Sequence, residues 1–127
     1  MISPLVIFAF NRPAYLKKCL ISLKLNSLSC KTKTYFFIDY PKFEKDFKNY
    51  NKVIKIIKET SIFKQKIIIQ RKYNYGLKKN ILSGIDYVLK KNETVIVLED
   101  DLYLSKYFLD YMNKYLQFFK NSKKIAS

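Results

Sequence analysis

Three acidic residues in a row, Glu99, Asp100 and Asp101, follow directly after the apolar run Val95–Leu98. Adjacent carboxylates repel one another unless a cation lies near them, and oxygen ligands of this kind suit Mn²⁺ or Mg²⁺, which also bind substrate phosphates. The acids stand out because 25 Lys and Arg face only 10 Asp and Glu, for a net charge of +15. The alternative is a solvated loop whose negative charge favours the start of a helix near Ser105. Their place straight after a buried run favours a metal bridged to a diphosphate.

Polar residues also follow the other three apolar runs of the chain. They are Asn11 and Arg12 after Leu5–Phe10, Asp39 after Tyr35–Ile38, and Arg71, Asn74 and Gly76 after Ile67–Ile69. Arg12 and Arg71 are the only arginines, and a guanidinium at a strand end can clamp phosphate or pair with the acids. For Arg12 an ordinary surface ion pair is the alternative. The turn Asn74-Tyr75-Gly76 permits positive φ before a helix whose N-terminus faces an anion, although most such turns only end a strand.

The elements that position these residues follow from the apolar pattern. The four runs are continuous rather than alternating, which is typical of strands covered on both faces. Each run is followed by a segment with apolar residues at helical spacing. These residues are Leu16, Cys19, Leu20 and Leu23; Phe47, Tyr50, Ile54 and Ile57; Leu77, Ile81, Ile85 and Val88; and Phe108, Met112, Tyr115 and Phe119. The order predicts an α/β fold with a mostly parallel sheet of about four strands and helices on both faces.

Start signals agree with these boundaries, and the end of the chain suggests a further element. Pro13 stands where a first helical turn tolerates it, and Ser105 is a candidate cap for the last helix. The residues Ile125-Ala126-Ser127 resemble the opening of another apolar strand. No repeat or linker divides residues 1–127, so one unit is predicted. In an open parallel sheet the ligand crevice lies beyond the carboxyl ends of the strands, where all the polar residues above fall.

Composition narrows the function classes without naming one. Nearly all the basic residues are Lys, a bias that explains much of the charge without any particular partner. Cys19 and Cys30 have no metal-type spacing and predict reduced thiols. No apolar segment approaches the roughly 20 residues that span a bilayer. We expect a cytoplasmic location, with contact between the Lys-rich surface and the inner face of an anionic membrane as a further expectation.

Several stretches together resemble one known family. They are residues 4–13 (PLVIFAFNRP), residues 37–42 (FIDYPK), residues 74–77 (NYGL) with Asn80, Ser83 and Gly84, and residues 95–102 (VIVLEDDL). In order and spacing the chain is similar to the N-terminal, nucleotide-sugar-binding half of family 2-like glycosyltransferases with the GT-A fold. The resemblance covers essentially all 127 residues.

The resemblance implies roles for the strand-end residues. The acids correspond to the family's D-x-D motif, with Asp101 as the ligand of Mn²⁺ or Mg²⁺ and with Glu99 and Asp100 beside the sugar diphosphate. Asn11 and Arg12 would lie near the nucleotide, Asp39 near the base, and Arg71, Asn74, Gly76 and Asn80 along the pocket. The family places its acceptor site, for a glycan or lipid-linked acceptor, and its carboxylate base in a further segment. That segment would follow residue 127, so the catalytic residues stay unknown, and a sheet edge left uncovered here would promote self-association.

Other functions fit less well. A phosphate-accepting receiver domain places its paired acids after the first strand, and here they follow the fourth. A nucleotidyltransferase needs a glycine-rich loop where this chain has Asn11-Arg12-Pro13. A non-catalytic basic module that binds nucleotides or nucleic acid fits the charge, but the aromatic residues recur mainly at core-facing spacing. No specific nucleic-acid partner is therefore predicted.

Overall fold

The computed structural model describes the backbone of residues 1–126 and the side chains of residues 1–120. The strands are β1 (Leu5–Ala9), β2 (Lys33–Ile38), β3 (Gln65–Gln70) and β4 (Ile96–Glu99). The helices are α1 (Pro13–Lys24), α2 (Phe47–Glu59), α3 (Leu77–Leu89) and α4 (Phe108–Ala126), with short 3₁₀ turns at Ser29–Lys31 and Glu44–Asp46. The predicted alternation of strand and helix is confirmed, and strand ends differ from the predicted ones by one or two residues.

The four strands form one parallel sheet in the order β3-β2-β1-β4. In the centre, Leu5 of β1 lies level with Thr34 of β2 and Ile96 of β4. The chain steps outward from β1 through β2 to β3, and then returns to add β4 on the other side of β1. The direction of winding therefore reverses between β1 and β4, which is where open parallel sheets form their ligand crevice.

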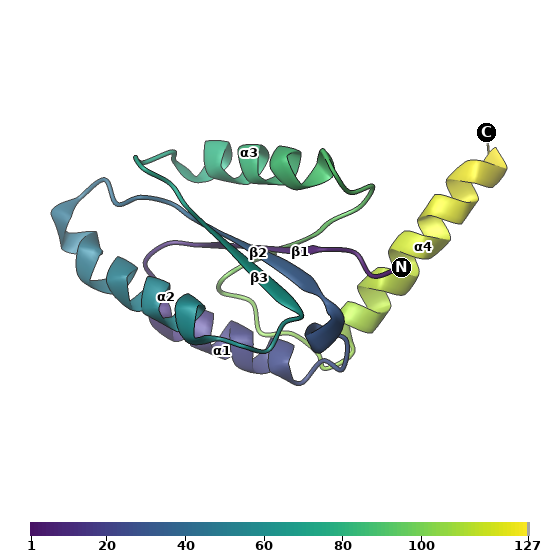
Figure 1. Cartoon of the computed structure of the whole chain (residues 1–127), viewed down its shortest axis with the longest axis horizontal. Helices are drawn as coiled ribbons and strands as arrows, with labels where there is room; N and C mark the ends of the chain where they lie inside the picture. The colour runs from purple at the N-terminus through teal and green to yellow at the C-terminus, as the bar shows by residue number, and fades with distance from the viewer. Residues whose placement is uncertain (127) are drawn as a thin grey trace.

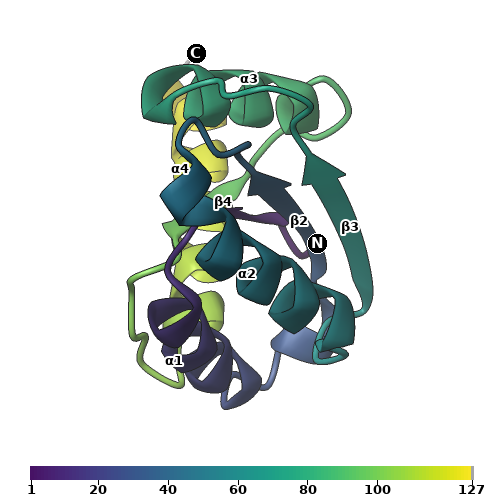
Figure 2. The same cartoon turned by 90° about the vertical axis from the view of Figure 1, so that its left-hand side faces the viewer.

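Helices cover both faces of the sheet, as predicted (Figures 1 and 2). Side chains alternate along a strand, so β1 sends Leu5, Ile7 and Ala9 to one face and Val6 and Phe8 to the other. The first face packs against α1, α2 and the start of α4, and the second packs against α3. The strand-end residues are thus held by a sheet with a core on either side.

The prediction that all four strands are covered on both faces is wrong for the two edge strands. In β4, Ile96 and Leu98 are buried, whereas Val97 and Glu99 are exposed, and β3 is only half-buried along its middle. Only β1 and β2 are buried along nearly their whole length. The single helix on the α3 side does not extend over β4, so one face of β4 faces solvent.

Two expectations about the last helix are also wrong. Tyr115 and Phe119 do not face the core, being 52% and 58% exposed; Phe108, Leu109, Met112 and Leu116 do. Apolar residues occupy a wide arc of this helix, and sequence spacing alone could not tell which part of that arc packs against the core. Ile125 and Ala126 continue α4 instead of starting a strand, and Ser127 lies outside the described residues.

Helix starts agree better with expectation. Pro13 is the first residue of α1, where its missing N–H costs no hydrogen bond. Ser105 does not cap α4 itself: its hydroxyl accepts a hydrogen bond at 3.2 Å from the N–H of Tyr107, in the turn that precedes the helix. Buried Asn26 ties the same region to α1, because its side chain donates to the carbonyl of Ser105 and accepts from the N–H of Leu109. Among the described residues no helix is long and apolar enough to cross a bilayer.

The two cysteines should differ sharply in reactivity. Burial, with smaller contributions from Asp100 and Asp101, raises the pKa of Cys19 to about 11, whereas Cys30 is exposed. Only thiolates react with disulfide reagents. Titration with such a reagent at pH 8 should therefore modify one thiol quickly and the second only after unfolding. Cys30→Ser should abolish the fast phase, and two equally fast thiols in the folded wild-type chain would contradict the burial of Cys19.

Candidate functional site

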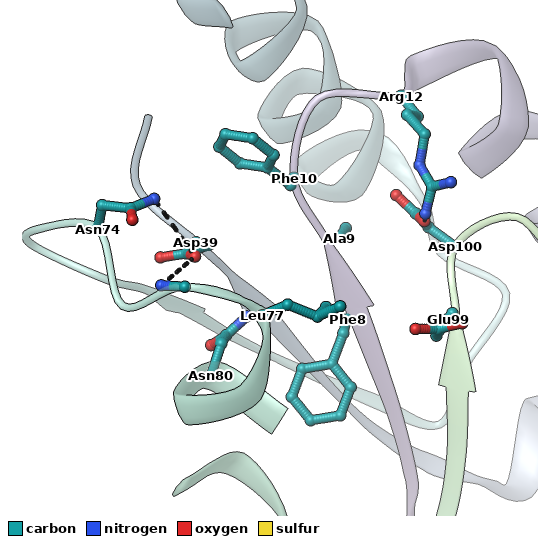
Figure 3. Close-up of a pocket in the computed structure, with 11 residues that line it drawn as sticks. Phe8, Ala9, Phe10, Arg12, Asp39, Asn74, Leu77, Asn80, Glu99 and Asp100 are labelled. Atoms are coloured by element: carbon teal, nitrogen blue, oxygen red, sulfur yellow. Dashed lines mark hydrogen bonds and ion pairs between the residues drawn. The ribbon is translucent and has the colours of Figure 1, made fainter. Parts of the chain in front are cut away.

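A cavity of about 270 Å³ opens at the carboxyl ends of the strands, at the reversal point between β1 and β4 (Figure 3). Predicted site residues that line it are Arg12, Asp39, Asn74, Gly76, Asn80, Glu99 and Asp100. Residues that sequence reasoning missed are the apolar Phe8, Ala9, Phe10 and Leu77. The sheet thus brings together side chains from all four strand ends, separated by up to about 90 positions in the sequence. Leu77 is 67% exposed although it is apolar, and it lines the cavity from the first residue of α3.

Asp39 organises the turn that closes one side of this cavity. Its carboxylate is only 7% exposed and accepts hydrogen bonds from the N–H groups of Tyr40, Tyr75 and Gly76 at 2.8–3.0 Å. The Asn74 side chain donates to the carbonyl of Tyr40 at 2.7 Å and lies 3.5 Å from an Asp39 oxygen. An anion was expected opposite the start of α3, and the structure provides it within the chain, as Asp39 itself.

Gly76 allows this turn to meet the helix. Its φ of +80° lies in the region that side-chain-bearing residues avoid, and α3 begins at the next residue. Its carbonyl accepts the N–H of Asn80, so the first turn of α3 is built directly on it. Asn80 is 3% exposed and faces the cavity from that turn. The wall formed by Asn74, Gly76 and Asn80 is therefore rigidly attached to both Asp39 and α3.

Arg71 lies outside the cavity lining and acts as a brace behind that wall. Its guanidinium donates to the side chains of Asn80 and Ser83 at 2.9 Å each. It also lies between two rings, 4.3 Å from the centre of Tyr75 and 4.9 Å from that of Phe37. The Nε and Nη2 atoms of this guanidinium are thus engaged within the chain, so Arg71 positions Asn80.

The acidic residues divide between the two faces of the sheet. Because side chains alternate, Glu99 lies on the α3 side, while Asp100 turns to the α1 side and is 2% exposed. Arg12 reaches across from the end of β1, with Nη2 2.5 Å from Asp100 Oδ1 and Nη1 3.5 Å from Asp101 Oδ2. One guanidinium thus serves both aspartates, while Glu99 faces the cavity separately.

Asp100 is a buried acid in which only one of the two carboxylate oxygens has a partner among the described residues. Its Oδ2 atom is buried and has no hydrogen-bond partner among the described residues. Burial raises the pKa of the Asp100 carboxyl above its usual value, although Arg12 acts in the opposite direction. Burial prevails over this close ion pair because only one of the two oxygens is compensated. A buried oxygen without a partner beside a cavity is a position where a ligand would be stabilising.

The acids suit a divalent cation that takes only one or two protein ligands. In the part of the chain that the structure describes, no three His, Cys, Asp or Glu side chains are grouped as a ready-made metal cage. Mg²⁺ and Mn²⁺ do not need one, since they commonly use one or two carboxylates and complete their shell with phosphate oxygens and water. Among these acids the half-exposed Asp101 is open to a cation, whereas the unpartnered oxygen of Asp100 is buried and would first have to become accessible.

Asn11 and Asp101 are the other two predicted residues that do not line the cavity. The Asn11 amide donates to Asp46 at 2.9 Å and so links the loop after β1 to the 3₁₀ turn before α2. Asp101 also lies beside the lining rather than within it, paired with Arg12 at the open rim. Asn11, Arg71 and Asp101 thus surround the cavity, each already engaged with another side chain.

Comparison with known proteins gives a likeness in fold. No protein-family model and no curated protein matches the sequence. Among solved structures, the chain is similar to S. aureus TarS residues 1–349, with a TM-score of 0.63 and 16% identity over 92% of this chain. A second TarS structure from S. aureus matches with a TM-score of 0.60 and 15% identity over 84% of this chain. The match spans 32% and 18% of those two chains. The chain is thus similar in fold to part of a known glycosyltransferase.

Proposed function

We propose that this chain binds a nucleotide-sugar donor, together with Mn²⁺ or Mg²⁺, in the cavity between β1, β4 and α3. On this proposal it serves the transfer of the sugar to a glycan or lipid-linked acceptor. The observation that carries the proposal is the composition of the cavity at the reversal point of the sheet. Apolar side chains form its base, and carboxylate, amide and guanidinium groups converge on its rim.

The nucleoside would occupy the part of the cavity between β1 and α3. Phe8, Phe10 and Leu77 offer apolar surface for a base, and Asn74 and Asn80 offer amide groups for its polar edge or the ribose. Asp39 has both oxygens engaged by backbone N–H groups, so its role on this side is to hold the turn in place. A volume of about 270 Å³ accommodates part of a nucleotide sugar, and the open rim takes the remainder.

The diphosphate would lie toward β4, where the charged groups are. Asp101 is the proposed ligand of the cation, with Asp100 and Glu99 close to the phosphates. Arg12, which is 45% exposed at the same rim, would contact a phosphate oxygen. A bound Mn²⁺ or Mg²⁺ would act as a Lewis acid, neutralising charge on the leaving nucleoside diphosphate.

Transfer also requires a base that takes the proton of the acceptor hydroxyl. Within the described cavity Asp39 is occupied by N–H groups and Asp100 by Arg12. Neither is arranged to accept a proton from an incoming alcohol, and Glu99, the third carboxylate of the lining, lies beside the phosphates on this proposal. For the base and the acceptor site the proposal rests on the family resemblance alone, which implies a further segment for both.

Calorimetry with purified chain tests the donor-binding proposal. UDP, GDP, CDP and ADP should be titrated one at a time, with Mn²⁺ and then with excess chelator. We expect one of them to bind with Mn²⁺ and to lose measurable binding in chelator. Asp101→Asn should weaken binding at least about tenfold, the loss expected when one charged contact is removed.

The matched control is Asp86→Asn, which removes the same charge from an exposed position of α3 outside the cavity. It should leave affinity unchanged. Equal affinity with and without chelator, or an Asp101→Asn variant that binds as well as wild type, would remove the metal from the proposal. If none of the four nucleotides binds under either condition, the donor-binding function itself is wrong.

A further inference from the structure

The backbone of Arg12 is anchored at the start of α1. It caps the N-terminus of α1, and its carbonyl accepts the N–H of Leu16 at 3.0 Å. Pro13, the next residue, fixes the start of the helix. The guanidinium lies 5.8 Å from the centre of the Tyr15 ring and faces the end of β4 on its other side. This anchored backbone keeps the positive charge of Arg12 at the acidic rim.

The two ion pairs of Arg12 are unequal. The contact with Asp100 is close, at 2.5 Å, and its carboxylate is almost fully buried. The contact with Asp101 is longer, at 3.5 Å, and both partners are more than a third exposed. An exposed pair at this distance contributes little and exchanges readily with water, whereas a buried partner is costly to abandon. Nη1 can therefore leave Asp101 while Nη2 keeps its bond to Asp100.

The charges next to the Arg12 guanidinium are those of Asp100 and Asp101, because Glu99 faces the cavity separately on the α3 side. Asp100 and Asp101 together with Arg12 carry a net charge of −1. A divalent cation alone would turn this into +1, directly beside a guanidinium. A diphosphate alone would add negative charge next to Asp101 and Glu99. A cation that arrives with a diphosphate brings its own counter-charge, and Asp100, whose Oδ2 atom has no partner among the described residues, is one of the residues that line this side of the cavity.

We propose that Arg12 is the resident counter-ion of Asp100 and Asp101, which keeps a divalent cation from binding alone and admits it together with a diphosphate. This inference rests on the proposed function, because it describes how the same site would select its ligand. On binding, Nη1 leaves Asp101 for a phosphate oxygen, and Asp101 becomes free to bind the cation. Arg12 is in this sense a specificity-determining residue: it makes the binding of the cation and that of the diphosphate depend on each other.

The test measures binding of Mn²⁺ alone, by the loss of the electron paramagnetic resonance signal of the free ion. Wild type should bind Mn²⁺ weakly, and Arg12→Gln should bind it at least about tenfold more tightly. The guanidinium and the cation would share one carboxylate, and the repulsion between their positive charges lowers the affinity for the cation by about this factor even with water-like screening. Lys18→Gln, which removes one positive charge from an exposed position of α1, should bind like wild type. No gain in Arg12→Gln would overturn the proposal.

A second measurement uses the wild-type chain and needs no variant. UDP, GDP, CDP or ADP should raise the affinity for Mn²⁺ at least about tenfold, after correction for the Mn²⁺ that each nucleotide holds in solution. If none of the nucleotides that bind to the wild-type chain changes its affinity for Mn²⁺, the proposed role of Arg12 is wrong. This result decides the question even if Arg12→Gln does not fold. Arg12→Lys, which keeps the charge, should bind Mn²⁺ alone as weakly as wild type.

The outcomes separate this inference from the proposed function. If a nucleoside diphosphate binds with Mn²⁺ but Arg12→Gln gains no affinity for Mn²⁺ alone, the role of Arg12 is wrong and donor binding stands. If no nucleotide binds, the proposed function falls, and so does the claim that Arg12 admits a cation with a diphosphate. The comparison of Mn²⁺ affinities would then still decide whether Arg12 is the counter-ion of the two aspartates.

Discussion

Asp39→Ala should lower the free energy of unfolding by about 3 kcal/mol and detach the turn at residues 74–76. The buried carboxylate accepts hydrogen bonds from three backbone N–H groups, and hydrogen bonds to a charged group contribute roughly 1.5–3 kcal/mol each, although not additively. The N–H groups of Tyr75 and Gly76 would lose their acceptor, and the wall of the cavity would lose its support. Urea unfolding measures the stability, and hydrogen exchange at these two amides measures the local opening.

This substitution distinguishes two roles for Asp39. The family resemblance implies a position near the nucleotide base, which predicts weaker nucleotide binding with unchanged stability. The structure shows an acceptor for the turn, which predicts a loss of stability before any ligand is added. Asp86→Ala, at an exposed position of α3, should change stability by no more than about 0.5 kcal/mol. An Asp39→Ala variant as stable as wild type would show that the turn is held by other contacts.

Gly84→Val should be still more disruptive, with a loss of about 3 kcal/mol or more. A β-carbon at this position of α3 would lie 2.7 and 2.9 Å from two ring atoms of Phe8 and 3.2 Å from one of Phe37. The two rings stack on each other at 5.6 Å on central strands, so neither can move aside without disturbing the core. Overpacking alone costs roughly 1–3 kcal/mol, and the two further methyl groups of Val add to it.

The same substitution should also reach the cavity, because Phe8 forms part of its lining. Nucleotide affinity should fall along with stability, and both are measurable on one preparation. Leu82→Val is the matched control, since it places the same β-branched residue at an exposed position of the same helix. It should cost only a few tenths of a kcal/mol. Similar losses in the two variants would mean that the close approach of α3 to the sheet is not what requires glycine.

The general plan of the fold was predictable because it depends on local pattern. Apolar runs alternate with helical spacing, and this alternation requires parallel strands with helices on both faces. The place of the site followed from the same plan, since parallel strands present their carboxyl ends at one edge. Arg12, Asp39, Gly76 and Asp100 were accordingly predicted from sequence and do meet at one cavity.

The errors arose where neighbours in space, not in sequence, decide the outcome. Tyr115 and Phe119 have the right spacing for a core-facing stripe, but the apolar arc of α4 is wider than the surface that packs, and the core covers only the part that carries Leu109, Met112 and Leu116. The strand β4 has a continuous apolar sequence, yet one side of it is exposed because no helix extends over it. Periodicity cannot report whether a partner is present on each face.

The polar groups at the strand ends show most clearly what the sequence determines and what only the tertiary structure decides. The sequence alone indicated that charged and amide side chains gather at this edge of the sheet, because Arg12, Asp39 and Glu99 lie at or just after strand ends. Only the tertiary structure decided their partners: Asp39 accepts the turn before α3, Arg71 braces Asn80, and Arg12 joins Asp100 to Asp101. These bonds connect residues 9–89 positions apart, and their geometry depends on the packing of whole elements. Local sequence sets what a residue can bond to, and the fold sets which of those bonds lies within reach.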